Sequence, residues 1–235
     1  MKILALESSA TACSVALCED DKLIAQTFQN NGLTHSCTLM PMLDSLLNQC
    51  GQTMDDVDVL AVAAGPGSFT GLRIGVAAVK GLAWAGEKPC APCSTLESMA
   101  WQLAHMDGIV IAAMDARRSQ VYNAVFRARN GSLERLTPDR AIGLEELEEE
   151  VKKFEERKIL VGDGALLCYN RWKERMEDLA LAPVHLRAQT AWGVARAALE
   201  LIRQDELIPG GQLAPVYHRL SQAERERLAK EQNKQ

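Results

Sequence analysis

The sequence predicts an α/β protein built from two halves of similar fold. The chain has 235 residues, of which 47% are hydrophobic and 24% are charged; this is the profile of a globular protein with enough apolar material for a core. Segments with strand and helix character follow one another in the order β-β-β-α-β-α, and this order occurs twice. Such an order predicts a mixed sheet covered by helices in each half.

The first half begins with three strands, expected at residues 2–7, 13–19 and 22–28. A helix follows, with Thr34 as its cap and Leu39, Leu43, Leu46 and Leu47 on one face. Pro41 fits a helix only in the first turn, so we expect an irregular entry. The remaining elements are a strand at 57–65, a glycine-rich segment leading into a helix to about residue 85, a strand at 89–94 and a helix at 95–105.

The second half repeats this order from residue 109. The expected elements are strands at 109–115, 121–128 and 132–136, a helix at 143–157 and a strand at 158–164. Glu7 and Asp115 stand at equivalent ends of the two first strands. Helices are expected near 165–176 and 190–204, with a short strand at 181–186. The alternative is that the two halves share a common order by accident.

These observations predict three regions. Residues 1–106 form the N-terminal half. Residues 107–220 form the C-terminal half, from which a late helix packs back on the first. Residues 221–235 form a charged, solvated tail.

Charge and hydropathy limit the classes of function. The net charge is −5 and the pI is about 5.5, so the totals lack the basic footprint of a protein that binds nucleic acid on its own. Glu7 interrupts the opening apolar residues, which therefore do not form a signal peptide. No run approaches the roughly 20 apolar residues of a membrane span. We therefore expect a cytoplasmic protein.

The cysteines and histidines predict no metal or cofactor site. The seven cysteines lie mostly in apolar runs, as buried free thiols do in a reducing compartment. Cys90 and Cys93 form one C-x-x-C, which alone is weak evidence for zinc or redox chemistry, and that role stays open. No two of the four histidines stand at a metal-ligand spacing. They are His35, His105, His185 and His218.

The stretch GPGSFTGLRIG, residues 65–75, matches neither common nucleotide-binding template. It lacks the lysine of a P-loop and the glycine spacing of a dinucleotide loop. Gly71, Gly75 and Ala78 instead form a stripe of small residues along one helix face. Each glycine in a helix costs about 1 kcal/mol relative to alanine, so close approach of another backbone must offset this cost. The partner is a helix of this fold or of another chain.

A nucleotide clamp between the two halves has incomplete machinery. Its phosphate-binding turns would be residues 7–11 and 115–119, and neither contains the glycine on which such turns rely. Arg117 and Arg118 could contact a phosphate or make surface ion pairs. The segment VGDG at residues 161–164 could approach an adenosine, but it is short and not specific for one.

Four segments together resemble the TsaB (YeaZ) family: MKILALESSATACSVAL, AGPGSFTGLRIGVAAVKGLA, MDARRSQVYNAVF and PVYHRLSQAE. The resemblance covers nearly the whole chain. It implies the actin/sugar-kinase-like (ASKHA) fold with two RNase-H-like βββαβα halves. It also implies a noncatalytic subunit that pairs with TsaD, with TsaE as the ATPase, in threonylcarbamoyl transfer to the tRNA adenosine beside the anticodon. TsaC would supply the threonylcarbamoyl-adenylate, tRNA would be met only through the complex, and the protein alone would be a homodimer.

The same resemblance explains why no catalytic residue is expected. TsaD carries a His-x-x-x-His metal pair, and Thr95 and Met99 stand at the corresponding positions here. A hydroxyl and a thioether cannot replace two imidazoles. Glu97 remains between them without a metal to serve. Glu7 stands where aspartate is common in the family, and His218 replaces a more usual leucine; neither has an assigned role.

The resemblance also places the partner interface on two helices, those after His35 and after Gly67. It implies apolar contact by Leu39, Leu43 and Leu46, with close approach permitted by Gly71, Gly75 and Ala78. The alternatives are an actin-like-fold ATP-dependent enzyme and a peptidase.

Overall fold

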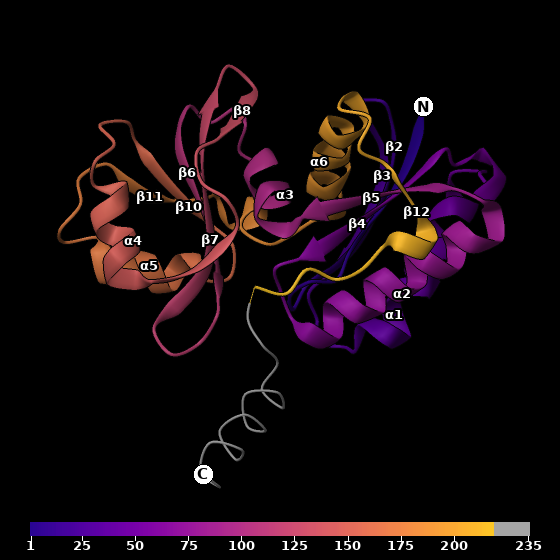
Figure 1. The fold of residues 1–235 in the computed structure, drawn as a ribbon, viewed down its shortest axis with the longest axis horizontal. Helices are drawn as coiled ribbons and strands as arrows, with labels where there is room; N and C mark the ends of the chain where they lie inside the picture. Colours follow the sequence, from indigo (N-terminus) through magenta and orange to yellow (C-terminus); the bar gives the residue numbers. More distant parts are fainter. Residues whose placement is uncertain (219–235) are drawn as a thin grey trace, which may run out of the picture.

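Two lobes, each built around one sheet, make up the molecule (Figure 1). The computed structural model describes residues 1–218, so the predicted charged tail at 221–235 lies outside the described residues.

The sheet of the N-terminal lobe has the order β12-β5-β4-β1-β2-β3. Its strands are β1 (Lys2–Glu7), β2 (Cys13–Glu19), β3 (Lys22–Gln29), β4 (Val59–Gly65), β5 (Pro89–Ser94) and β12 (Ile208–Pro209). β1 is central: Leu4 pairs with Leu17 of the antiparallel β2 and with Leu60 of the parallel β4. Helices α1 (His35–Gln49) and α2 (Phe69–Gly86) cover one face, and α6 (Ala191–Arg203) covers the other. The short 3-10 turns η1 (Met54–Asp56) and η3 (Gly210–Gln212) flank this lobe.

The sheet of the C-terminal lobe repeats this arrangement as β11-β10-β6-β7-β8. Its strands are β6 (Gly108–Asp115), β7 (Gln120–Arg129), β8 (Ser132–Arg135), β10 (Lys158–Val161) and β11 (Leu179–Leu181). An additional strand, β9 (Arg140–Gly143), pairs with β7 and was not expected from the sequence. Helices α4 (Leu144–Val151) and α5 (Ala165–Trp172) pack on one face.

Both sheets therefore share one topology. In each, three strands (β1–β3 and β6–β8) are antiparallel neighbours, and two further strands (β4 and β5, β10 and β11) continue in parallel on the other side of the first. This is the RNase-H-like arrangement, and two copies of it form the actin/sugar-kinase-like fold. The predicted fold class is confirmed.

Helix α3 (Thr95–Trp101) joins the lobes. Leu96 and Met99 pack in the apolar cluster of the second sheet, whereas Trp101 packs in the cluster that α6 forms with the first sheet. α3 and α6 lie side by side between the lobes (Figure 1). The late helix expected to pack back on the first half is α6.

Several elements differ from the sequence expectation: β9 and β12 were not expected, and α3 and α5 end at Trp101 and Trp172, before their expected ends. α1 is continuous through Pro41; the residue is exposed, so the carbonyl that loses its helical partner can be hydrated. The strand expected at 181–186 is β11, which ends at Leu181. Pro183 cannot donate to a ladder, and residues 184–186 form the 3-10 turn η2 (Val184–Leu186). The helix expected at 143–157 ends at Val151, and the Lys158 ammonium donates to the Phe154 and Glu156 carbonyls beyond it.

Candidate functional site

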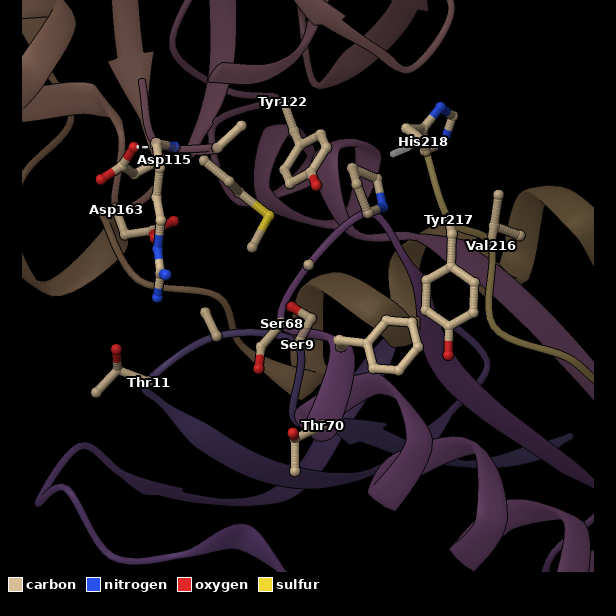
Figure 2. Close-up of a pocket in the computed structure, with 17 residues that line it drawn as sticks. Ser9, Thr11, Ser68, Thr70, Asp115, Tyr122, Asp163, Val216, Tyr217 and His218 are labelled. Carbon is tan, nitrogen blue, oxygen red and sulfur yellow. Dashed lines mark hydrogen bonds between the residues drawn. The ribbon is translucent and has the colours of Figure 1, made fainter. Parts of the chain in front are cut away.

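A cleft of about 660 Å³ separates the two lobes. Its N-terminal wall carries hydroxyl groups of the turn after β1 and of the β4–α2 loop, and its C-terminal wall carries Asp115 and Asp163 (Figure 2). The last described residues, 216–218, line it as well. A nucleotide clamp between the two halves would occupy this cleft.

The glycines of α2 serve the packing of this wall. The Ser8 hydroxyl donates to the Gly71 carbonyl (2.9 Å), and the Ser68 N–H donates to the Ser9 carbonyl (2.6 Å). A Cβ at Gly71 would overlap the Ser8 carbonyl oxygen, and one at Gly75 would overlap the Ser8 hydroxyl. The stripe of small residues therefore lets the turn after β1 approach α2 within the monomer. The packing is internal, but the partner of Gly71 and Gly75 is this turn and not the helix expected from the sequence.

The leucines assigned to the partner interface are also internal. Leu39, Leu43 and Leu46 are buried in the cluster that α1 and α2 form with the first sheet. Ala78 is half-buried at the edge of that cluster. A partner therefore cannot touch Leu39, Leu43, Leu46, Gly71 or Gly75 directly, because the monomer covers them. These five residues therefore support the fold instead of contacting a partner. The placement of the interface on the two helices stays a prediction.

The outer faces of the same helices carry different residues. Ala77, Gly81 and Ala85 are exposed at four-residue spacing along α2, and Trp84 beside them is 88% exposed. Met40 of α1 is exposed too. This second small-residue stripe was not expected from the sequence, although its four-residue spacing is a signal that could identify it.

Backbone strain marks the C-terminal wall of the cleft. Arg117, Arg118 and Ser119 follow one another with φ of +62°, +56° and +56°, a left-handed conformation that non-glycine residues rarely adopt. The Asp115 carboxylate accepts a hydrogen bond from the Arg117 N–H at 2.7 Å. Neither Arg117 nor Arg118 makes an ion pair within residues 1–218 that would support the surface-pair alternative.

The glycines of residues 161–164 also serve internal packing. A Cβ at Gly162 would overlap the Ala113 carbonyl oxygen, and the Gly164 N–H donates to the same carbonyl at 3.0 Å. Asp163 between them accepts from the Gln189 amide at 3.0 Å. Removal from water within the cleft raises the pKa of Asp163.

The two equivalent strand-end acids differ in environment. Glu7 is fully buried, whereas Asp115 is exposed. The Ser9 N–H donates to Glu7 Oε1 at 2.5 Å, and Oε2 has no hydrogen-bond partner among the described residues. Burial raises the pKa of Glu7 to about 7, and hydrogen bonds from Ser9 oppose this shift only in part.

The residues considered for metal chemistry lie in packed surroundings. Thr95 and Met99 are fully buried, and the Met99 sulfur lies against the Gly162 backbone. Glu97 pairs with Arg135 at 2.6 Å. Within residues 1–218, no three or more His, Cys, Asp or Glu side chains are grouped so as to hold a metal ion.

The C-x-x-C pair is split between two cores. Cys90 belongs to the cluster under α1 and α2, and Cys93 belongs to the cluster under α6, so the thiols lie on opposite faces of β5. Both are free, and burial raises the pKa of each. His35 Nε2 lies 2.7 Å from the Ala10 carbonyl, joining the start of α1 to the turn after β1. None of these three residues forms a site with the others.

Comparisons with known proteins agree with the topology. A family model described as TsaD, tRNA N6-adenosine threonylcarbamoyltransferase, matches residues 29–228. The tRNA threonylcarbamoyladenosine biosynthesis protein TsaB of Bacillus subtilis (strain 168) is 33% identical, over 95% of this chain and 96% of its own. The TsaB protein of Escherichia coli (strain K12) is 30% identical, over 93% of this chain and 95% of its own.

A solved structure shows the same arrangement. YeaZ from Pseudomonas aeruginosa superposes with a TM-score of 0.76 at 27% identity, covering 92% of this chain and 99% of that one. The two RNase-H-like lobes and the cleft between them define a protein of the actin/sugar-kinase-like class. Within this class the chain belongs to the TsaB (YeaZ) family. None of the helices in residues 1–218 combines the length and apolar character that a membrane span requires.

Proposed function

We propose that this protein is the noncatalytic subunit that pairs with TsaD, together with TsaE, in threonylcarbamoyl transfer to the tRNA adenosine beside the anticodon. The observation that carries the proposal is the burial of the two α3 residues that stand at the metal-ligand positions of TsaD. Where TsaD is expected to hold a metal between two histidines, Thr95 and Met99 are fully buried, and Met99 packs in the apolar cluster of the second sheet. Neither side chain is a ligand for a hard or borderline metal.

We place the partner interface on the outer faces of α1 and α2. Exposed tryptophan is uncommon on a monomer's surface, and tryptophan is enriched among the residues that dominate binding energy. Trp84 stands 88% exposed beside Gly81, where an added Cβ would meet no atom within 4 Å. Gly81 and its neighbours Ala77 and Ala85 leave room for a partner helix to approach. The buried leucines of α1 support this surface from within.

Gly81→Leu tests the interface without disturbing the monomer. A leucine there meets open space and removes a helix glycine, so we expect the monomer to gain up to about 1 kcal/mol of stability. At the same time its side chain should block the approach of TsaD. Gly75→Leu would be a poor test, because its side chain would collide with Ser8 inside the monomer.

The measurement is co-purification with tagged TsaD, alongside thermal unfolding of each variant. Gly143→Leu is the matched control, since Gly143 also faces open space but lies on the other lobe. We expect Gly81→Leu and Trp84→Ala to lose TsaD, and Gly143→Leu to retain it. Retention of TsaD by a folded Gly81→Leu variant would refute the interface.

The proposed role also implies a location, a route to tRNA and an oligomeric state. The protein would act in the cytoplasm, meet tRNA only through the complex, and use the same outer face to form a homodimer when alone. An ATP-dependent enzyme is the competing reading, because the cleft between the lobes is open and contains Arg117. Calorimetry with Mg-ATP on the isolated protein separates the two: micromolar binding would favour the enzyme.

A further inference from the structure

The C-terminal segment, residues 213–218, connects α2 with the cleft between the lobes. Its last three residues line the cleft, and Figure 2 shows their side chains there. Tyr217 also reaches α2: its ring stacks on Phe69 at 4.5 Å, and its hydroxyl accepts a hydrogen bond from the Arg73 Nε–H at 3.1 Å. The Arg73 guanidinium lies over the same Phe69 ring at 3.8 Å. One side chain of the segment therefore contacts both α2 and the cleft.

The body of the N-terminal lobe is shaped to receive this segment. The Val216 N–H donates to the Ala64 carbonyl in β4 at 2.7 Å. The next residue of β4 is Gly65, with a φ of +144°, and a Cβ there would overlap the Val216 carbonyl oxygen. Leu213 is fully buried, whereas Val216 and Tyr217 remain 49% and 41% exposed. The segment is thus seated on the lobe while its outer side is open to a partner.

Arg73 lies on the face of α2 that we assign to the partner. Arg73, Ala77 and Gly81 follow one another at four-residue spacing, and all three are exposed. Arg73 and Trp84 are about three helical turns apart, so they lie on one line of the helix with a separation of about 16 Å. Arg73 makes no ion pair within residues 1–218. Tyr217 therefore stands at one end of the proposed docking face, and Trp84 stands toward the other.

We propose that TsaD, when docked along α2, also packs on Tyr217 and fixes the C-terminal segment against the cleft. This inference rests on the proposed pairing with TsaD and adds a second anchor to it. Tyrosine and tryptophan are both enriched among the residues that dominate binding energy. An acidic side chain of the partner would pair with the Arg73 guanidinium beside the ring. Docking on the outer face of α2 would then fix one wall of the cleft between the lobes.

Hydrogen exchange of residues 213–218 reads this contact directly. The full-length protein is followed by mass spectrometry alone and in complex with TsaD. We expect peptides that cover the segment to exchange several-fold more slowly in the complex, because the partner opposes the local opening that frees the Val216 N–H from Ala64. Strand β8 of the other lobe serves as the internal control, and its exchange should not change.

Three variants report on the same contact through affinity. Tyr217→Ala should weaken TsaD binding roughly tenfold, as truncation of an anchoring aromatic residue does. Tyr217→Phe keeps the ring and should retain most of the affinity. Leu166→Ala is the matched control, because Leu166 is 49% exposed but lies on α5 of the other lobe. Thermal unfolding verifies that each variant is folded.

The outcomes separate this inference from the pairing itself. A wild-type protein that does not bind TsaD would refute the proposed function and this inference with it. If the wild type binds TsaD, two results would overturn the inference alone. One is exchange of residues 213–218 that is unchanged or faster in the complex, and the other is a Tyr217→Ala variant that binds as tightly as the wild type. Either result would leave the interface at Gly81 and Trp84 in place.

Discussion

The small residues of α2 have roles that depend on what packs against them. Gly71 and Gly75 repeat at the spacing of a helix-packing stripe, and the sequence correctly identifies that something must approach them closely. It cannot say from which side, because Ala77 and Gly81 repeat at the same spacing on the opposite face. The structure resolves this: the Ser8 turn fills the first stripe, and the second stripe is open.

Glu7 should make stability fall as pH rises. Its folded-state pKa of about 7 lies above its usual value of 4.5. Between these pH values unfolding releases a proton, so the free energy of unfolding falls as the pH rises through this window. Glu7→Gln should therefore be more stable than wild type at pH 8 by roughly 3 kcal/mol, and about equal at pH 4. Urea unfolding at both pH values measures this. Glu19→Gln, an exposed control, should leave the difference near zero. An equal effect of Glu7→Gln on the free energy of unfolding at both pH values would refute the raised pKa of Glu7.

Among the elements, the strands and the repeated order were predictable because they follow local periodicity. The position of α3 between both sheets was not. Its seven residues are almost all buried, on all sides, so they carry no amphipathic signal that distinguishes one sheet from the other. β12 was missed for a related reason, since two residues paired with β5 carry no periodicity.

The C-terminal segment 213–218 is an element that depends on tertiary contacts alone. Leu213 is fully buried, the Val216 N–H donates to the Ala64 carbonyl (2.7 Å), and the Tyr217 ring stacks on Phe69 at 4.5 Å. The Arg73 Nε–H donates to the Tyr217 hydroxyl at 3.1 Å. Together these contacts hold the segment along the wall of the cleft, where Figure 2 shows Val216, Tyr217 and His218.

Tyr217→Ala should release this segment. The stacked pair is expected to contribute about 1 kcal/mol beyond its buried area, so its loss should increase the amide exchange rate of Val216 several-fold while the sheets keep their protection. Hydrogen exchange followed by mass spectrometry measures this. Tyr217→Phe keeps the ring and should retain most of the protection. Unchanged exchange in Tyr217→Ala would show that the stack does not hold the segment.

At the scale of the whole molecule, the two lobes have retained the architecture of a nucleotide clamp while its expected parts serve packing. The turn after β1 is hydrogen-bonded to α2, and the backbone of β6 packs closely against Gly162 and Gly164. Thr95 and Met99 of α3 are buried. Exposed features of the described residues include the outer stripe of α2 with Trp84 and the cleft between the lobes. This distribution of buried and exposed groups is the one that the proposed docking role requires.

The most direct test of this account is the mass of the protein in solution, measured by light scattering after size exclusion, alone and mixed with TsaD. We predict that the wild type forms a stable complex with TsaD and that Gly81→Leu, although folded, remains separate from it. A wild-type mixture that elutes as two independent species, or a Gly81→Leu variant that joins TsaD as well as the wild type does, would contradict the account.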